Sequence, residues 1–217
     1  HDALPISSYG SVSMLPVTYG YLLMLGAEGL KHVTEMAILN ANYLASSFEK
    51  LGFKILFKGK QGRVGHEMIW DCSAFNKEYG ISELDIAKRL MDFGFHAPTL
   101  SFPVHGTLMV EPTESEPKEE LDRFIEALKT IREEMCEVAE GKADKTDNVL
   151  KNAPHTHKVL TADEWTHTYP RSKAAYPLPW VAENKFWPQV GRVDDGYGDR
   201  NLMCTCDPLY DYVNDEN

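Results

Sequence analysis

Three carboxylates stand close together between a strand-like run and an amphipathic pattern in SFPVHGTLMVEPTESEPKEELDRF, residues 101–124. Glu111 ends an apolar, strand-like run and precedes Pro112, whereas Glu114 and Glu116 stand directly before an amphipathic pattern. Catalytic and ligand-binding groups are common where an element ends beside a turn. We therefore take Glu111 as the candidate functional carboxylate of this stretch.

Glu114 and Glu116 have a simpler explanation as the start of a helix. Acidic residues there interact favourably with the helix dipole. Thr113 and Glu116 have the spacing of a capping box, and Ser115 is an alternative cap that would put Pro117 in the first turn. We expect these two glutamates to begin the helix that follows.

Five of the eight histidines fall into two groups. His155, His157 and His167 supply an H-x-H pair and a third imidazole, which zinc accepts as ligands, but the loop spacing is unspecific and we predict no metal site. His96 and His105 flank APTLSFPV in a turn between a predicted helix and a predicted strand, where binding groups often lie. A hydrogen-bonded loop histidine is the alternative for both.

Two arginines stand among glycines and aspartates in GRVDDGYGDRN, residues 191–201. Gly196 and Gly198 favour a tight turn, and Arg192 and Arg200 are suited to clamp a carboxylate or a phosphate. Structural salt bridges to the neighbouring aspartates are the alternative; these are Asp194, Asp195 and Asp199. The residues alone leave both explanations open.

The four cysteines do not form the dense pattern of a secreted disulfide framework, and they favour a reducing compartment. Cys72 and Cys136 lie within predicted elements, and we expect buried thiols. Cys204 and Cys206 form a CTC pair, for which a redox role competes with plain thiols.

The elements that must position these residues follow from the spacing of apolar side chains. Apolar residues recur at three- and four-residue steps in the helical stretches, and Ser82 is suited to cap one of them. We predict helices over 11–26, 30–52, 82–93 and 121–141, and strands over 53–57, 67–72 and 107–111. This order predicts an α+β fold: a short antiparallel or mixed sheet with helices on one face.

Composition argues against two kinds of partner. The net charge of −11 disfavours nucleic acid, whose phosphates need basic patches. No apolar run is long enough to span a bilayer, and HDALPISSYG at the start lacks the pattern of a signal peptide. We expect neither a nucleic-acid nor a membrane partner.

The character of the chain changes from Lys142 onward. Prolines and glycines interrupt the periodicity, yet tryptophans and tyrosines are frequent. Because a disordered linker would lack such aromatics, we expect an ordered, irregular extension over 142–217 that wraps over another surface. The small α+β domain then covers 30–141, and a helical segment covers 1–29.

Several long segments resemble one enzyme family. They are, in chain order, SYGSVSMLPVTYGYLLMLG, FGFHAPTLSFPVHGTLMVEPTESE, NAPHT, YPRSKAAYPLP and KFWPQVGRVDDGYGDRNLMCTC. These resemble the carboxyl-terminal end of glycine dehydrogenase (decarboxylating), the P-protein of the glycine cleavage system. A non-catalytic α+β module that binds a small molecule is the competing interpretation.

The resemblance implies the small carboxyl-terminal domain of a fold type I pyridoxal-phosphate (PLP) enzyme. Residues 1–29 would then pack on a large PLP domain upstream. The family decarboxylates glycine and passes the aminomethyl group to the lipoyl arm of the H-protein. The resemblance also implies that the complete enzyme is a homodimer. It would be located in the cytoplasm of a bacterium or in the mitochondrial matrix of a eukaryote.

The resemblance also implies which residues lie at the rim of the active site. They are His96, Thr99, Thr107, Glu111 and Thr113, with Arg192 and Arg200 as candidates to hold the glycine carboxylate or to orient the extension. The family's Schiff-base lysine lies in a His-Lys motif followed by glycines. Lys31 in GLKHVTE has the reversed order, and Lys158 in THK lacks the glycines.

We therefore expect a carboxyl-terminal fragment that contains no catalytic lysine, binds no PLP and is inactive alone. A surface that should dock on the large domain would be exposed in the isolated chain. We expect apolar side chains near the start to form it, namely Met14, Leu15, Tyr19, Leu22 and Leu23.

Overall fold

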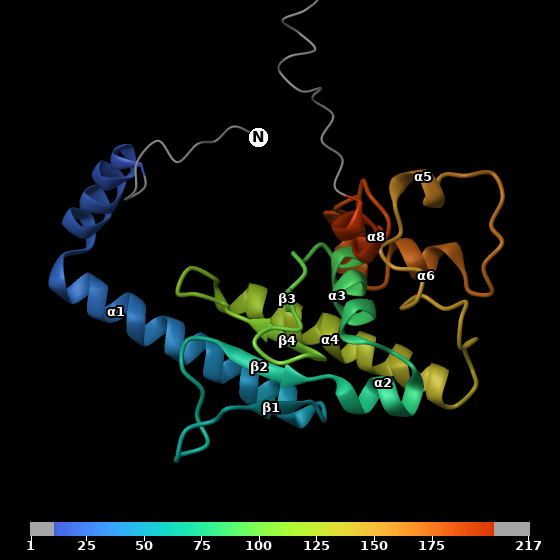
Figure 1. The fold of residues 1–217 in the computed structure, drawn as a ribbon, viewed down its shortest axis with the longest axis horizontal. Coiled ribbons are helices and arrows are strands. Elements are labelled where there is room, and N and C mark those ends of the chain that lie inside the picture. Colours follow the sequence, from blue (N-terminus) through green and yellow to red (C-terminus); the bar gives the residue numbers. More distant parts are fainter. Residues whose placement is uncertain (1–10, 202–217) are drawn as a thin grey trace, which may run out of the picture.

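The computed structural model describes residues 11–201 and has a four-stranded antiparallel sheet at its centre, in the order β1-β2-β4-β3 (Figure 1). The strands are β1 (Lys54–Leu56), β2 (Met68–Asp71), β3 (Thr99–Leu100) and β4 (Thr107–Val110). The α+β class and the three predicted strands are confirmed. We did not predict β3, because two residues are too short a run to show periodicity.

The helices of the first part of the chain are a short 3-10 turn, η1 (Val12–Met14), followed by α1 (Leu15–Lys50), α2 (Ser73–Tyr79), α3 (Glu83–Asp92) and α4 (Lys118–Ala139). The predicted helices are confirmed, and the seven-residue α2 was missed. The two helices predicted before residue 52 are both present within α1 and are separated by a kink at Gly26, whose φ of 60° and ψ of −173° are not helical. Glycine adopts that conformation because it has no Cβ to clash.

One face of the sheet packs against α1 and α4. The register aligns Ile55, Trp70 and Leu108 across β1, β2 and β4, and all three are buried. The ring of Phe48 in α1 lies 5.4 Å from Trp70 and 5.8 Å from Phe124 in α4, measured between centroids. These contacts join the two helices to the same sheet face, as the sequence predicted.

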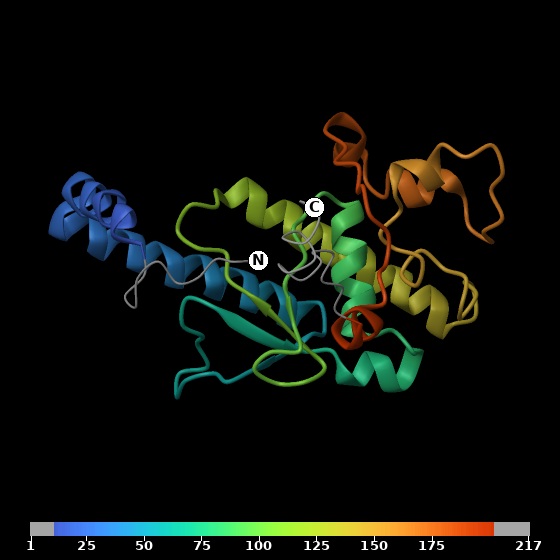
Figure 2. The ribbon, with the colours of Figure 1, turned by 45° about the horizontal axis from the view of Figure 1, so that its top comes forward.

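The start of α1 projects from the rest of the molecule (Figures 1 and 2). Its apolar side chains are exposed; they are Val12, Met14, Leu15, Val17, Tyr19, Tyr21, Leu22, Leu23 and Met24. We call residues 12–25 the apolar arm. The expected exposure of apolar side chains here is confirmed, and it argues against a self-contained binding module, since soluble monomers rarely expose contiguous apolar patches of this kind.

Between residues 142 and 201, the described part of the extension, there are four short helices: α5 (His157–Leu160), α6 (Arg171–Ala175), α7 (Pro179–Glu183) and α8 (Asp195–Arg200). Part of it rests on α3 and α4 of this same chain. The ring of Trp180 lies 6.3 Å from Phe93 and 6.2 Å from Phe95, and its indole N–H donates to Glu126 at 2.8 Å. Within residues 11–201, no helix is long and apolar enough to cross a membrane.

Candidate functional site

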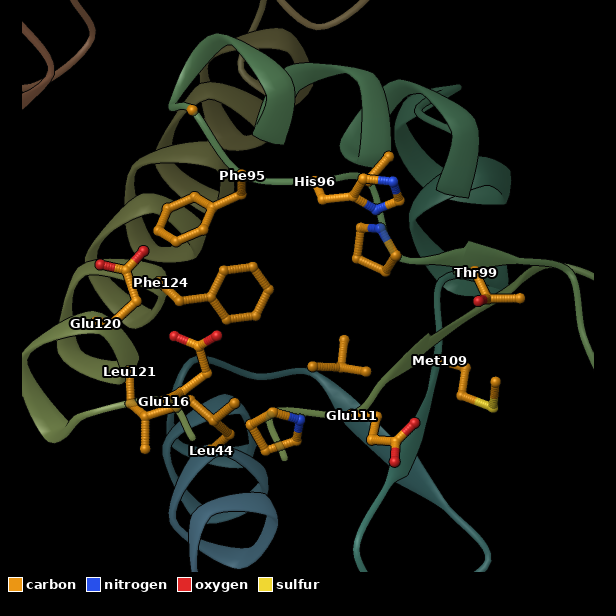
Figure 3. A pocket seen from close by; sticks show the side chains of 15 residues that line it. Leu44, Phe95, His96, Thr99, Met109, Glu111, Glu116, Glu120, Leu121 and Phe124 are labelled. Atoms are coloured by element: carbon orange, nitrogen blue, oxygen red, sulfur yellow. The ribbon is translucent and has the colours of Figure 1, made fainter. Parts of the chain in front are cut away.

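A pocket of about 450 Å3 opens between the start of α4, the segment after α3 and the end of β4 (Figure 3). Its apolar lining includes Leu44 of α1, Leu121 and Phe124 of α4, and Phe95. The rings of Phe95 and Phe124 meet edge to face with centroids 5.0 Å apart. An apolar concave surface with a few polar groups around it is the usual form of a small-molecule site.

The charged residues that line this pocket are acidic. Glu111 follows β4, Glu116 precedes α4 and Glu120 lies in the first turn of α4 (Figure 3). No lysine or arginine of residues 11–201 is among the lining residues, although Glu120 pairs with Arg123 outside the lining. The resulting field favours a ligand that carries an amine and repels a phosphate.

Three of the predicted rim residues come together in this pocket. His96 lies in the segment after α3, Thr99 in β3 and Glu111 directly after β4, and all three are exposed. The antiparallel pairing of β3 with β4 places Thr99 opposite Met109, which brings it near Glu111. The fold therefore collects residues from three separate places in the sequence.

Glu111 has a neighbour that the sequence does not indicate. The His66 imidazole Nε2 lies 3.8 Å from Glu111 Oε1 and 4.0 Å from Glu67 Oε2. The β2–β4 register pairs Met68 with Val110, so the residues just before β2 lie beside Glu111. His66 carries no motif that would have identified it, because only the register of the strands brings it there.

The other two predicted threonines, Thr107 and Thr113, do not line the pocket. Thr107 is 1% exposed, and its hydroxyl donates to the Val104 carbonyl, so it lies beneath the 101–106 loop and does not line the pocket. Thr113 lies in the turn between Glu111 and Glu116 and has a φ of 58°. Its Oγ1 is 2.8 Å from Ser115 Oγ and accepts from the Ser115 amide.

The expectation that Glu114 and Glu116 begin the helix, capped by Thr113 or Ser115, was wrong. α4 begins at Lys118, its N-cap is Pro117, and no side chain caps it. The physical reason is the left-handed Thr113, which turns its side chain back onto Ser115 and closes a separate turn before the helix. Glu116 consequently faces the pocket.

Arg192 lies outside the pocket and is engaged within the chain. Its guanidinium donates to Asp85 Oδ1 at 2.6 Å and to the carbonyls of Leu150 and Ala153, both at 2.7 Å. Burial alone would raise the pKa of the Asp85 carboxyl, but hydrogen bonds from Lys151, the Ser82 amide and Arg192 outweigh it and lower that pKa. These contacts argue that Arg192 has a structural role. A role of Arg192 in holding the glycine carboxylate stays a prediction.

The aspartates next to Arg192 in the sequence, Asp194, Asp195 and Asp199, are not its partners in these contacts. Asp194 instead caps α8 by accepting from the Tyr197 amide at 2.8 Å. Arg200 is exposed at the end of α8 and does not line the pocket. Cys204 and Cys206 lie outside the described residues.

The three histidines considered for zinc have separate partners. His155 is 1% exposed, with Nδ1 2.7 Å from Asp92 Oδ2 and Nε2 2.8 Å from the Tyr169 hydroxyl. His167 pairs with Asp147 at 2.7 Å, and the exposed His157 packs against Trp187, with ring centroids 5.5 Å apart. Over residues 11–201 no group of three or more histidines, cysteines or acidic residues is placed to hold a metal ion.

His155 belongs to a buried ionic cluster that ties the extension to α3 and α4. Arg89 is fully buried and donates to Glu134 at 2.6 and 3.0 Å and to Asp92 at 2.9 Å. Burial would raise the pKa of Asp92, but hydrogen bonds from His155 and the charge of Arg89 lower it. Arg89 also donates to the carbonyl of Lys173 at 3.0 Å, which fixes α6.

The two described cysteines differ in burial. Cys72 is buried, and its burial raises the pKa of the thiol far above its ordinary value. Cys136 is half-buried, with Arg132 Nη1 at 3.0 Å from its sulfur, so the expectation of a buried thiol is correct for Cys72 alone.

Comparison with known proteins shows the family of this chain. The family model described as "Glycine dehydrogenase, C-terminal domain" matches residues 33–155. Proteins named "Glycine dehydrogenase (decarboxylating)" from Flavobacterium johnsoniae and Bdellovibrio bacteriovorus are 59% and 56% identical to this chain over 211 residues. Each match covers 97% of this chain but only 22% of the relative's length. The chain belongs to the glycine dehydrogenase family, and it matches the C-terminal domain of that family.

Proposed function

We propose that this chain is the carboxyl-terminal part of a glycine decarboxylase, and that it closes the active site of the complete enzyme. The observation that carries the proposal is the identity of 54–59% to enzymes named glycine dehydrogenase (decarboxylating), which extends over 96–97% of this chain. The complete enzyme would decarboxylate glycine and transfer the aminomethyl group to the lipoyl arm of the H-protein. We expect it to be a homodimer in the bacterial cytoplasm or the mitochondrial matrix.

The pocket of this chain does not fit PLP itself. A Schiff base needs a lysine, and the phosphate needs basic residues or free amides, whereas the charged lining residues are Glu111, Glu116 and Glu120. The cofactor would therefore be held by the large domain of a fold type I enzyme. When bound there, PLP supplies an electron sink for the carbanion left by decarboxylation.

In this proposal His96, Thr99 and Glu111 form the rim that faces the large domain, while Phe95 and Phe124 exclude water. The acidic field suits glycine's ammonium group and the aminomethyl product. The apolar arm docks on the large domain and fixes the position of the rim. Two features support this: the exposure of the arm, and the small fraction of the relatives' length that the chain spans.

The test is restoration of glycine–CO2 exchange when this chain is co-expressed with the upstream part of the enzyme. The isolated chain should show no exchange. Restored exchange supports the proposal, and exchange catalysed by the isolated chain contradicts it.

Charged substitutions in the arm test its part in the proposal. Leu23→Asp and Met24→Asp alter side chains that are 65% and 87% exposed, so the isolated chain should unfold at an unchanged temperature. Both should weaken association with the upstream part by tenfold or more, because a charge would be buried without a partner. Val193→Asp, at a side chain 60% exposed outside the arm, is the matched control and should bind as wild type does.

A further inference from the structure

Asn40 lies on the face of α1 that builds the pocket. Leu44, one turn later, lines the pocket, and Phe48 after it packs on Phe124. Residues four apart share a helix face, so the three form one stripe. Asn40 is the polar member of this stripe and is only 6% exposed.

The side-chain amide of Asn40 holds the turn before α4. Its Nδ2 donates to the carbonyl of Thr113 at 2.9 Å and to that of Glu116 at 3.3 Å. Both neighbours are acceptors, so only the NH2 end of the amide satisfies them. The turn needs this support, since Thr113 has a φ of 58°, an unfavourable conformation for a β-branched residue.

This turn connects two carboxylates of the pocket. Glu111 lies at its start and Glu116 at its end, and both line the pocket. We propose that Asn40 is a positioning residue that fixes Glu111 and Glu116 at the rim by clamping the turn between them. The inference rests on the proposed function, in which this rim faces the active site.

Asn42 provides a matched control on the same helix. Its Nδ2 donates to the carbonyls of Ile38 and Val64 at 2.8 and 2.9 Å, and its Oδ1 accepts from the Val64 amide at 3.1 Å. It thus makes the same kind of contact with a different loop. Val64 does not line the pocket.

The first experiment measures opening of the turn in the 217-residue chain. A glutamate-specific protease can cut the turn only at Glu114–Ser115, because prolines follow Glu111 and Glu116 and such proteases do not cut before proline. Asn40→Ala and the isosteric Asn40→Asp should speed cleavage at this bond by about tenfold or more, as expected for the loss of a buried hydrogen bond. Asn42→Ala should leave this rate within about twofold of wild type.

The second experiment measures glycine–CO2 exchange in the enzyme assembled with the upstream part. Asn40→Asp should lower kcat/KM for glycine by about tenfold, whereas Asn42→Ala, compared at a similar loss of Tm, should not. An unchanged cleavage rate in Asn40→Asp, or a loosened turn with wild-type kinetics, would overturn the inference. A wild-type assembly without exchange would instead refute the proposed function, and the cleavage result would be unaffected.

Discussion

Replacement of Arg89 by methionine removes the centre of the buried ionic cluster. Arg89 is fully buried, and its guanidinium donates to Glu134, to Asp92 and to the carbonyls of Lys173 and Ala174. Glu134 and Asp92 are themselves 3% and 0% exposed. The substitution therefore leaves Glu134 without its cation in a place that water does not reach, whereas Asp92 keeps its contacts with His155.

The expected loss of unfolding free energy is about 3–5 kcal/mol, the range for breaking a buried ion pair from one side. That is a large part of the total stability of a domain, about 5–15 kcal/mol. The loss should shrink as the pH falls from 7 toward 4, because protonation then removes the uncompensated charge. Arg89→Met combined with Glu134→Met should recover part of the loss, since an apolar replacement of a buried pair can be nearly neutral.

Urea unfolding followed by far-UV circular dichroism and tryptophan fluorescence measures these differences. Lys54→Met is the control: Lys54 pairs with Asp71 at 3.2 Å, but its side chain is 71% exposed, so its loss should cost less than about 1 kcal/mol. If Arg89→Met loses no more than the Lys54 variant, the cluster does not hold the extension on α3 and α4, and the reasoning fails.

Two further predictions concern α3 and the extension. Burial of the Lys185 amine lowers its pKa to about 8, below its ordinary value of 10.5. Between these two pH values the unfolded chain binds the extra proton, so the stability of wild type relative to Lys185→Met should rise from pH 8 to about 10.5; a difference that is flat over this range would contradict the shift. Ser82→Ala should lose about 1 kcal/mol in urea unfolding, because Ser82 and Asp85 form the capping box of α3. Ser115→Ala, at a residue that caps no helix, should change stability by less than about 0.5 kcal/mol; an equal loss in both variants would refute the assignment of the cap.

Local pattern was enough to predict most of the fold. The long helices α1, α3 and α4 are predicted because apolar residues recur at helical spacing, and the three longer strands because apolar runs are bounded by turn residues. Ser82 and its capping partner Asp85 are three residues apart, so the local sequence is enough to predict this cap. The breaks at Gly26 and Gly52 follow from the conformations that only glycine adopts easily.

The candidate site was predicted in part: the residue pattern pointed to His96 and Glu111, and the family resemblance added Thr99. His96, Thr99 and Glu111 were named and do line one pocket. The sequence predicts a helix cap for Glu116, because its spacing from Thr113 matches the capping-box motif. The same spacing gives no sign that Glu116 lines a pocket. The apolar lining was not recognised, because Leu44 and Phe124 carry the same helical pattern as any core residue.

The sequence by itself determined the long helices, the three longer strands, the family and the set of chemical groups that this chain offers. Only the tertiary structure decided which groups meet. Arg192 reaches Asp85 across 107 positions and His155 reaches Asp92 across 63, and neither pair was foreseen. A guanidinium or an imidazole can bond to many acceptors, and the choice among them is made by the packing of helices and strands, which no local stretch of residues specifies.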